Sequence, residues 1–234
     1  LIGTVGMWSV VVFIPDIEKE FGLDRGTSSL LYAFTMIGFG FGTVVIGKVY
    51  DKFGIKKPIL LATFVLITSY YFYSIFPFYW QFLILQFFMG FAASAFFGPA
   101  MADISNFFNK QRGFALSIVA SANYVAGATW PLLIGYFLTF IDWRDAHFWI
   151  SICLFIMIPL ILLLKNASVD ESKSHDMKQR YKDIRLDLSN NQIQVLLMLA
   201  GICCCVAMAM PQVHMVALCA VSYTHLTLPT SRSV

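Results

Sequence analysis

Long apolar stretches, separated by short polar segments, dominate the pattern of this chain. An α-helix needs about 20 mostly apolar residues to cross a membrane. Stretches of about that length predict spans at 30–46, 58–76, 79–101, 114–140, 148–164 and 193–217. The apolar residues 1–14 are too few for a span, so we expect them to be the end of a first helix that starts upstream. A polar loop is predicted at 15–29.

The spans divide the chain into four segments. We expect an all-α, multi-pass membrane protein in which residues 1–164 form a six-helix bundle with an incomplete first helix. The polar, charged residues 165–191 predict a linker on the cytoplasmic side. Residues 192–220 predict a seventh helix that begins a second bundle. The last segment, 221–234, reads VSYTHLTLPTSRSV and is predicted to be a non-native tail.

Composition supports a lipid environment. Hydrophobic residues make up 59% of the chain, charged residues make up 12%, and the mean hydropathy is +0.73. Soluble domains are about 45–50% apolar and about 25% charged. The net charge of +3 is small and scattered, which excludes the basic face that nucleic-acid binding needs. The five cysteines all lie in apolar stretches and indicate neither a disulfide framework nor a metal site.

The basic residues predict the orientation. Twelve lysines and arginines lie in the loops after the second, fourth and sixth spans, and three lie in the opposite loops. Cytoplasmic loops carry the excess of Lys and Arg. We therefore expect residues 47–57, 103–113 and 165–191 to be cytoplasmic.

One loop carries a motif. The segment GKVYDKFGIKK, residues 47–57, has its glycines, acid and basic residues at Gly47, Asp51, Lys52, Gly54, Lys56 and Lys57. A basic loop with a turn glycine is the plainer interpretation. At all six positions, however, the segment resembles the signature of the major facilitator superfamily, and it lies between the second and third spans as that signature does. Gly47 would allow two helices to approach closely, and Gly54 suits a turn with positive φ.

The resemblance implies a fold and a mechanism. Two further segments resemble the superfamily's turns into its fifth and sixth helices: NKQRGFALS, residues 109–117, and Asp142-Trp143-Arg144. A third segment resembles the seventh helix of monocarboxylate-porter-like members and oxalate–formate exchangers: PQVHMVAL, residues 211–218. The chain is then expected to be most of the first half of a twelve-helix secondary transporter, which moves a small solute by alternating access. Asp51 would help to hold the cytoplasmic gate closed in the outward-facing state.

The resemblance also implies partners and a location. We expect a protein of the plasma (cell inner) membrane, monomeric when complete, that carries a small-molecule substrate and possibly couples it to a proton. No cofactor is expected. Because no Lys or Arg lies deep within a span, a cation that binds a carboxylate would have to come from the other half. A cation exporter would need a buried acid in this half, and none is clear, so a small organic anion is the expected substrate.

Polar residues inside spans are candidates for contact with substrate. They are Gln86, Asn123, Tyr124, Gln212 and His214. The alternative is that they bond one helix to another. Close helix packing is predicted where small residues lie four apart. These sets are Gly38 and Gly42; Gly90, Ser94 and Gly98; and Gly127, Pro131 and Gly135.

A membrane-embedded enzyme would need acids, histidines or cysteines that converge at helical spacing within spans, and the sequence offers none. An enzyme and a metal site are therefore not expected. A channel, or a non-transporting sensor with the same fold, stays open as an alternative.

Overall fold

The computed structural model describes residues 2–107, 111–163, 189, 192–193, 195–196, 198–200 and 203. The chain separates into two units, 1–167 and 168–234, and the helices below belong to the first. The part of the chain that is described contains helices and no strand, which confirms the all-α prediction. The helices are a short 3-10 turn Ile2–Thr4, α1 Val5–Phe21, α2 Arg25–Phe53, α3 Lys56–Ile75, α4 Tyr79–Phe107, α5 Arg112–Phe137, α6 Trp143–Leu154 and α7 Met157–Leu163.

Five described helical segments are long and apolar enough to cross a membrane. They are Arg25–Phe53, Lys56–Ile75, Tyr79–Ile104, Gly113–Phe137 and Trp143–Leu163. They coincide with the predicted second to sixth spans and support a multi-pass membrane protein. Pro77 lies between α3 and α4, where the chain was predicted to break. The sixth span begins earlier than predicted, at Trp143, and a turn at Phe155–Ile156 divides it into α6 and α7.

The predicted loop at 15–29 is wrong. Helix α1 continues through Pro15 to Phe21, and α2 begins at Arg25. Only Gly22–Asp24 connects them, with Gly22 in the left-handed conformation at φ 61°. The Asp24 side chain caps α2 by accepting hydrogen bonds from the amides of Gly26 and Thr27. The charged residues of this segment extend the helices beyond the apolar span instead of interrupting them.

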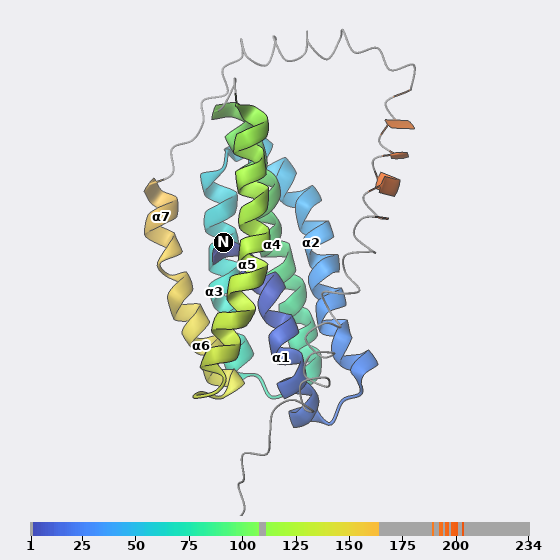
Figure 1. Cartoon of the computed structure of the whole chain (residues 1–234), viewed down its shortest axis with the longest axis vertical. Coiled ribbons are helices and arrows are strands. Elements are labelled where there is room, and N and C mark those ends of the chain that lie inside the picture. The colour runs from blue at the N-terminus through green and yellow to red at the C-terminus, as the bar shows by residue number, and fades with distance from the viewer. Residues whose placement is uncertain are drawn as a thin grey trace, which may run out of the picture. The chain divides into compact units, whose positions relative to one another are not determined.

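Helix α2 packs closely against its neighbour α4 (Figure 1). A methyl group on Gly38 would overlap the backbone of Phe87, and one on Gly90 would overlap the carbonyl group of Thr35. Gly42 likewise faces Phe91 and Ser94. Small residues therefore bring these helices together, as predicted. The same test places nothing within 4 Å of a methyl group on Gly47, Gly98 or Gly135, so the close approach predicted at those positions is not seen among the described residues.

Candidate functional site

The motif at 47–57 covers the last turns of α2, the two connecting residues Gly54 and Ile55, and the start of α3. Gly54 follows the last residue of α2 with φ 73° and ψ −175°, a conformation that is essentially confined to glycine. Its amide donates to the carbonyl of Tyr50 at 2.8 Å, and α3 begins at Lys56. The positive φ expected of Gly54 is therefore found.

The inner side of this turn is anchored in the bundle. Ile55 and Ile59 are buried with Ile161 of α7, and Tyr50, Phe96 and Met157 pack against this cluster. The Tyr50 hydroxyl also lies 3.5 Å from a carboxylate oxygen of Asp103 on α4, which is a long hydrogen bond. The turn is consequently fixed to α4 and α7.

The outer side of the turn is exposed and carries charge. Asp51, Lys52 and Lys57 are exposed, as is the ring of Phe53. The ammonium groups of Lys52 and Lys57 lie 5.4 and 4.8 Å from the centroid of this ring. In the part of the chain that the structure describes, none of these lysines forms an ion pair with an acid. The side of the motif with the signature charges is thus open to another molecule or another part of the protein.

Gln86 lies inside the helical unit. Its side chain is only 1% exposed, accepts a hydrogen bond from the Thr35 hydroxyl at 2.9 Å and donates to the Tyr73 hydroxyl at 3.3 Å. These bonds connect α4 to α2 and α3. In this conformation protein groups enclose the Gln86 side chain on the side of these bonds. For Gln86 the geometry favours the alternative interpretation, a bond between helices.

Asn123 and Tyr124 lie on α5 and differ in their surroundings. The Asn123 side-chain oxygen lies 3.4 Å from the indole nitrogen of Trp8 on α1, and the Trp8 ring also packs against Gly127. Tyr124 is 58% exposed. Helix α5 is mostly exposed, which leaves these residues accessible from outside the described unit. Gln212 and His214 lie outside the described residues.

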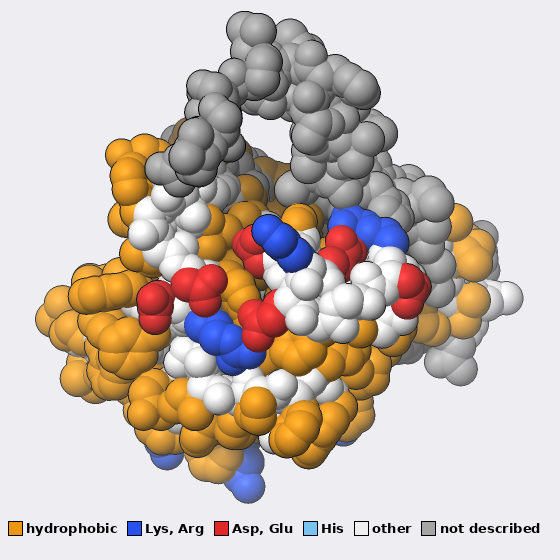
Figure 2. Space-filling view, turned by 90° about the horizontal axis from the view of Figure 1, so that it is seen from below, with side chains coloured by type: hydrophobic (Ala, Val, Ile, Leu, Met, Phe, Trp, Pro, Cys, Tyr) orange, Lys and Arg blue, Asp and Glu red, His pale blue; other side chains and the backbone are white. Residues whose placement is uncertain are grey.

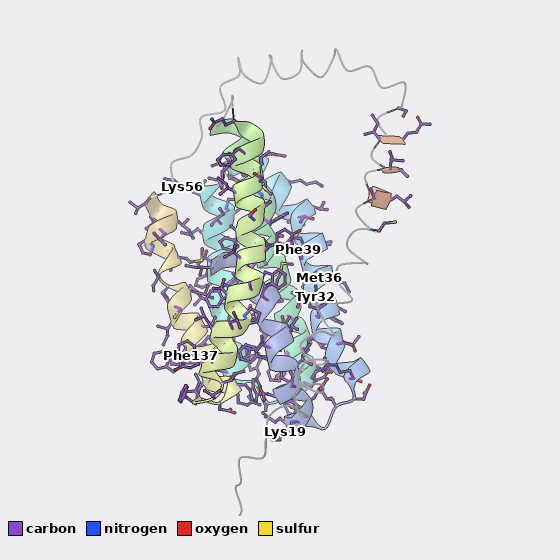
Figure 3. The ribbon with its side chains drawn as sticks, in the orientation of Figure 1. Lys19, Tyr32, Met36, Phe39, Lys56 and Phe137 are labelled. Carbon is purple, nitrogen blue, oxygen red and sulfur yellow. The ribbon has the colours of Figure 1, made fainter. Side chains whose placement is uncertain are left out.

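Further aromatic residues, not among the candidates from sequence, lie on α1, α2 and α4. Trp8 is one of them, and it was overlooked because it falls in the short apolar stretch at the start of the chain. Tyr32, Met36 and Phe39 succeed one another along α2 at helical spacing (Figure 3). The Phe39 ring lies 6.4 Å from that of Phe97 on α4. Tyr32 is buried, whereas Trp8, Met36, Phe39 and Phe97 are half-buried.

His147 is a second residue that sequence reasoning missed. It is 1% exposed on α6, one of its ring nitrogens lies 2.7 Å from the carbonyl oxygen of Trp143, and its ring stacks on Tyr73 at 4.4 Å. Phe13 packs against it at 4.0 Å. An ionisable side chain within a span was the available signal. Its enclosure by aromatic rings gives it a role in packing α1, α3 and α6.

The opposite end of the bundle holds a network of charges. Figure 3 shows Lys19 at this end and Lys56 at the other, and Figure 2 shows acidic and basic side chains gathered at this end. Glu20 accepts hydrogen bonds from Arg144 at 2.6 Å and from the indole nitrogen of Trp143 at 2.7 Å. Arg144 also donates to the carbonyl of Phe76 at 2.9 Å. A single ion-pair network thus connects the ends of α1, α3 and α6.

A second ion pair connects α1 to α2 at the same end. Arg25 lies 3.0 Å from the Glu18 carboxylate, which also accepts a hydrogen bond from the Ser28 hydroxyl.

Within the described ranges no group of three or more His, Cys, Asp or Glu side chains is arranged to hold a metal ion.

The fold and the motif together define a class: a multi-pass helical membrane protein whose second and third spans are joined by a tight, charged turn. Comparison with known families makes this specific. The model of the Major Facilitator Superfamily matches residues 1–229, and the chain belongs to that family. The family is one of transporters rather than enzymes.

Individual relatives point the same way. The chain is 28% identical over 151 residues to the MFS-type transporter pynF of Aspergillus niger, an alignment that covers 62% of this chain and 34% of the relative. It is 26% identical to the agnestins efflux protein AgnL12 of Paecilomyces divaricatus, over 64% of this chain and 35% of the relative. It is 32% identical to the fujikurins efflux protein of Gibberella fujikuroi, over 41% and 21%. The chain thus spans about a third or less of the length of these relatives.

Proposed function

We propose that this chain supplies the first half of a secondary active transporter that moves a small solute across a membrane by alternating access. The observation that carries the proposal is the α2–α3 turn. Its inner side is fixed to the bundle by Ile55 and Ile59, and its outer side presents Asp51 and the lysines to whatever lies next to it. A rigid charged turn of this kind suits a contact that forms in one state and breaks in the other.

In this proposal Asp51 binds the second half of the transporter and holds the cytoplasmic gate closed. A carboxylate at that position can pair with a lysine or with the N-terminus of a helix, where the macrodipole favours an anion. The orientation rests on the excess of basic residues at the end that carries this turn. The complete protein is taken to be a monomer in the plasma membrane.

Two substrate classes fit different observations. A small organic anion, as in monocarboxylate-porter-like and oxalate–formate-exchanging members, fits a cavity whose cation comes from the second half and a proton relay at His214. A larger, mostly apolar and aromatic solute fits the half-buried aromatic rings of Trp8 and Phe39. Two of the relatives are named efflux proteins, one for agnestins and one for fujikurins. Asn123 and Tyr124 are the polar groups that we propose for contact with either solute.

Transport by the complete protein in proteoliposomes is the decisive experiment. Uptake or release of solute that follows its own gradient or a proton gradient, and that saturates with concentration, would support a secondary transporter. Binding without transport would support the sensor, and flux that does not saturate would support the channel. A panel of monocarboxylates and neutral aromatic compounds then separates the two substrate classes.

The role of Asp51 is tested in the same preparation. Asp51→Asn removes the charge and keeps the shape, and an interaction at a helix end contributes about 0.3–2 kcal/mol. A loss near 1.4 kcal/mol shifts the ratio of inward to outward states about tenfold. Transport should fall, while the affinity for substrate changes little. Asp145→Asn, an exposed acid in the first turn of α6, is the matched control and should leave transport unchanged.

A further inference from the structure

A basic and aromatic surface at the α2–α3 turn has no partner among the described residues. The two ammonium groups of Lys52 and Lys57 lie close to one ring, that of Phe53, which is 45% exposed. The Gly54 turn brings Lys57, from the first turn of α3, back over the last residue of α2. Two like charges held near each other in this way repel, and an anion that binds both removes the repulsion.

At the other end of the bundle, arginines form ion pairs with acids of the same unit. Both ion pairs found in the described residues, Glu18 with Arg25 and Glu20 with Arg144, lie at that end. The two arginines there are neutralised by acids of the protein itself. No described acid forms an ion pair with the lysines of the turn, so the neutralising group is expected to come from elsewhere.

An apolar surface continues from these lysines along α3. Leu60, Leu61 and Phe64 follow Lys57 by three, four and seven residues, so all four share one face of the helix. Their side chains are exposed by 42%, 59% and 63%. Because α3 is one of the candidate spans, this face begins with charge at the helix end and becomes apolar towards the membrane interior. A phospholipid has the same order of groups.

We infer that the turn binds an anionic phospholipid. Its phosphate lies at the ammonium groups of Lys52 and Lys57, and an acyl chain lies along Leu60, Leu61 and Phe64 of α3. Basic residues next to a span attract the anionic lipids of the cytoplasmic leaflet. The lipid would lie on the lipid-facing side of the helices, so this inference does not depend on the transported solute.

Lipid binding to the purified 234-residue chain in nonionic detergent tests the inference. Native mass spectrometry would count bound dioleoyl phosphatidylglycerol and, separately, dioleoyl phosphatidylcholine, which has the same acyl chains without the net charge. We expect the wild-type chain to prefer the anionic lipid about tenfold. The double variant Lys52→Gln/Lys57→Gln should lose that preference, and Phe53→Leu should reduce it because the ring no longer holds the ammonium groups.

The control removes two charges from the same end and leaves the ring-held lysines in place. Lys48→Gln/Lys56→Gln should keep most of the preference for phosphatidylglycerol. Equal losses in the two double variants would overturn a defined site and leave only general attraction to basic charge. No preference in the wild-type chain would show that another group neutralises these lysines. Displacement of the lipid by excess inorganic phosphate would show that the site takes the phosphate group alone, which would also overturn the inference.

Discussion

The two ends of the helical unit differ in whether their charged side chains are paired within the unit. At one end, carboxylates of α1 pair with Arg25 and Arg144, and a backbone carbonyl of α3 accepts a further bond from Arg144. At the other end, the described lysines of the α2–α3 turn have an aromatic ring beside them and no acid paired with them. The first end joins helices of the same unit to one another. The second end keeps its charges available for groups outside it.

The difference has consequences for stability. A charge that is paired inside the unit contributes to the stability of the unit, and removing its partner leaves the other group partly buried and unpaired. A charge with no internal partner contributes little, whatever its role in binding. We therefore expect substitutions at the first end to change unfolding and equivalent substitutions at the second end to change binding. Unfolding measured in detergent tests this division.

Loss of Arg144 is expected to have the largest effect. Arg144→Ala removes the bonds to Glu20 and to the Phe76 carbonyl and the contact of the guanidinium with the Trp143 ring, 4.5 Å away. We expect the free energy of unfolding to fall by about 2–3 kcal/mol, as for hydrogen bonds to charged groups that are only partly exposed. Arg144→Lys keeps the charge without the planar fork and should lose about half as much. A change below about 0.5 kcal/mol would contradict an internal role for this network.

Gly54→Ala is expected to have the next largest effect, at the second end. The backbone of Gly54 has φ 73° and ψ −175°, and forcing alanine into that region costs about 1–3 kcal/mol. The matched control is Gly47→Ala in the interior of α2, where an added methyl group meets nothing within 4 Å. Alanine should there be neutral or stabilise the helix by up to about 1 kcal/mol. Equal effects at the two glycines would show that the turn is not constrained by its backbone.

Sequence reasoning predicted the spans well and the ends of the helices poorly. Apolar length determines a span, and for this reason the spans of α2 to α6 were predicted. The extent of α1 was not predicted, because Glu18 and Glu20 look like loop residues until their partners are known. Gln86 illustrates the same limit within a span. Its polarity marked it as a candidate, but only the positions of Thr35 and Tyr73 show that it bonds helices together. Partners that are distant in sequence decide such roles.

The Asp24 cap gives a smaller, pH-dependent effect at the first end. Hydrogen bonds from the Thr27 hydroxyl and amide hold the pKa of Asp24 below its usual range. Because the folded state lowers this pKa, the contribution of the ionised cap is present at neutral pH and is lost as the pH falls through the pKa of the folded state. Asp24→Asn should flatten this part of the acid limb of an unfolding curve. An unchanged acid limb would contradict a role for the charge.

Neutralising the turn lysines is expected to have the smallest effect on stability. Lys52→Gln/Lys57→Gln removes two charges that have no described acid paired with them, so unfolding in nonionic detergent without added lipid should change by less than about 0.5 kcal/mol. Any change at low salt should be a gain, because repulsion between the two ammonium groups is removed. That gain should disappear near 1 M salt, where the Debye length is about 3 Å. Glu18→Gln/Glu20→Gln, which also removes two charges, should destabilise the unit at either salt concentration, because the carboxylates bond to Arg25, Arg144 and Trp143. A clear loss of stability in the lysine variant would show that these lysines have a partner inside the chain, and the contrast between the two ends would then fail.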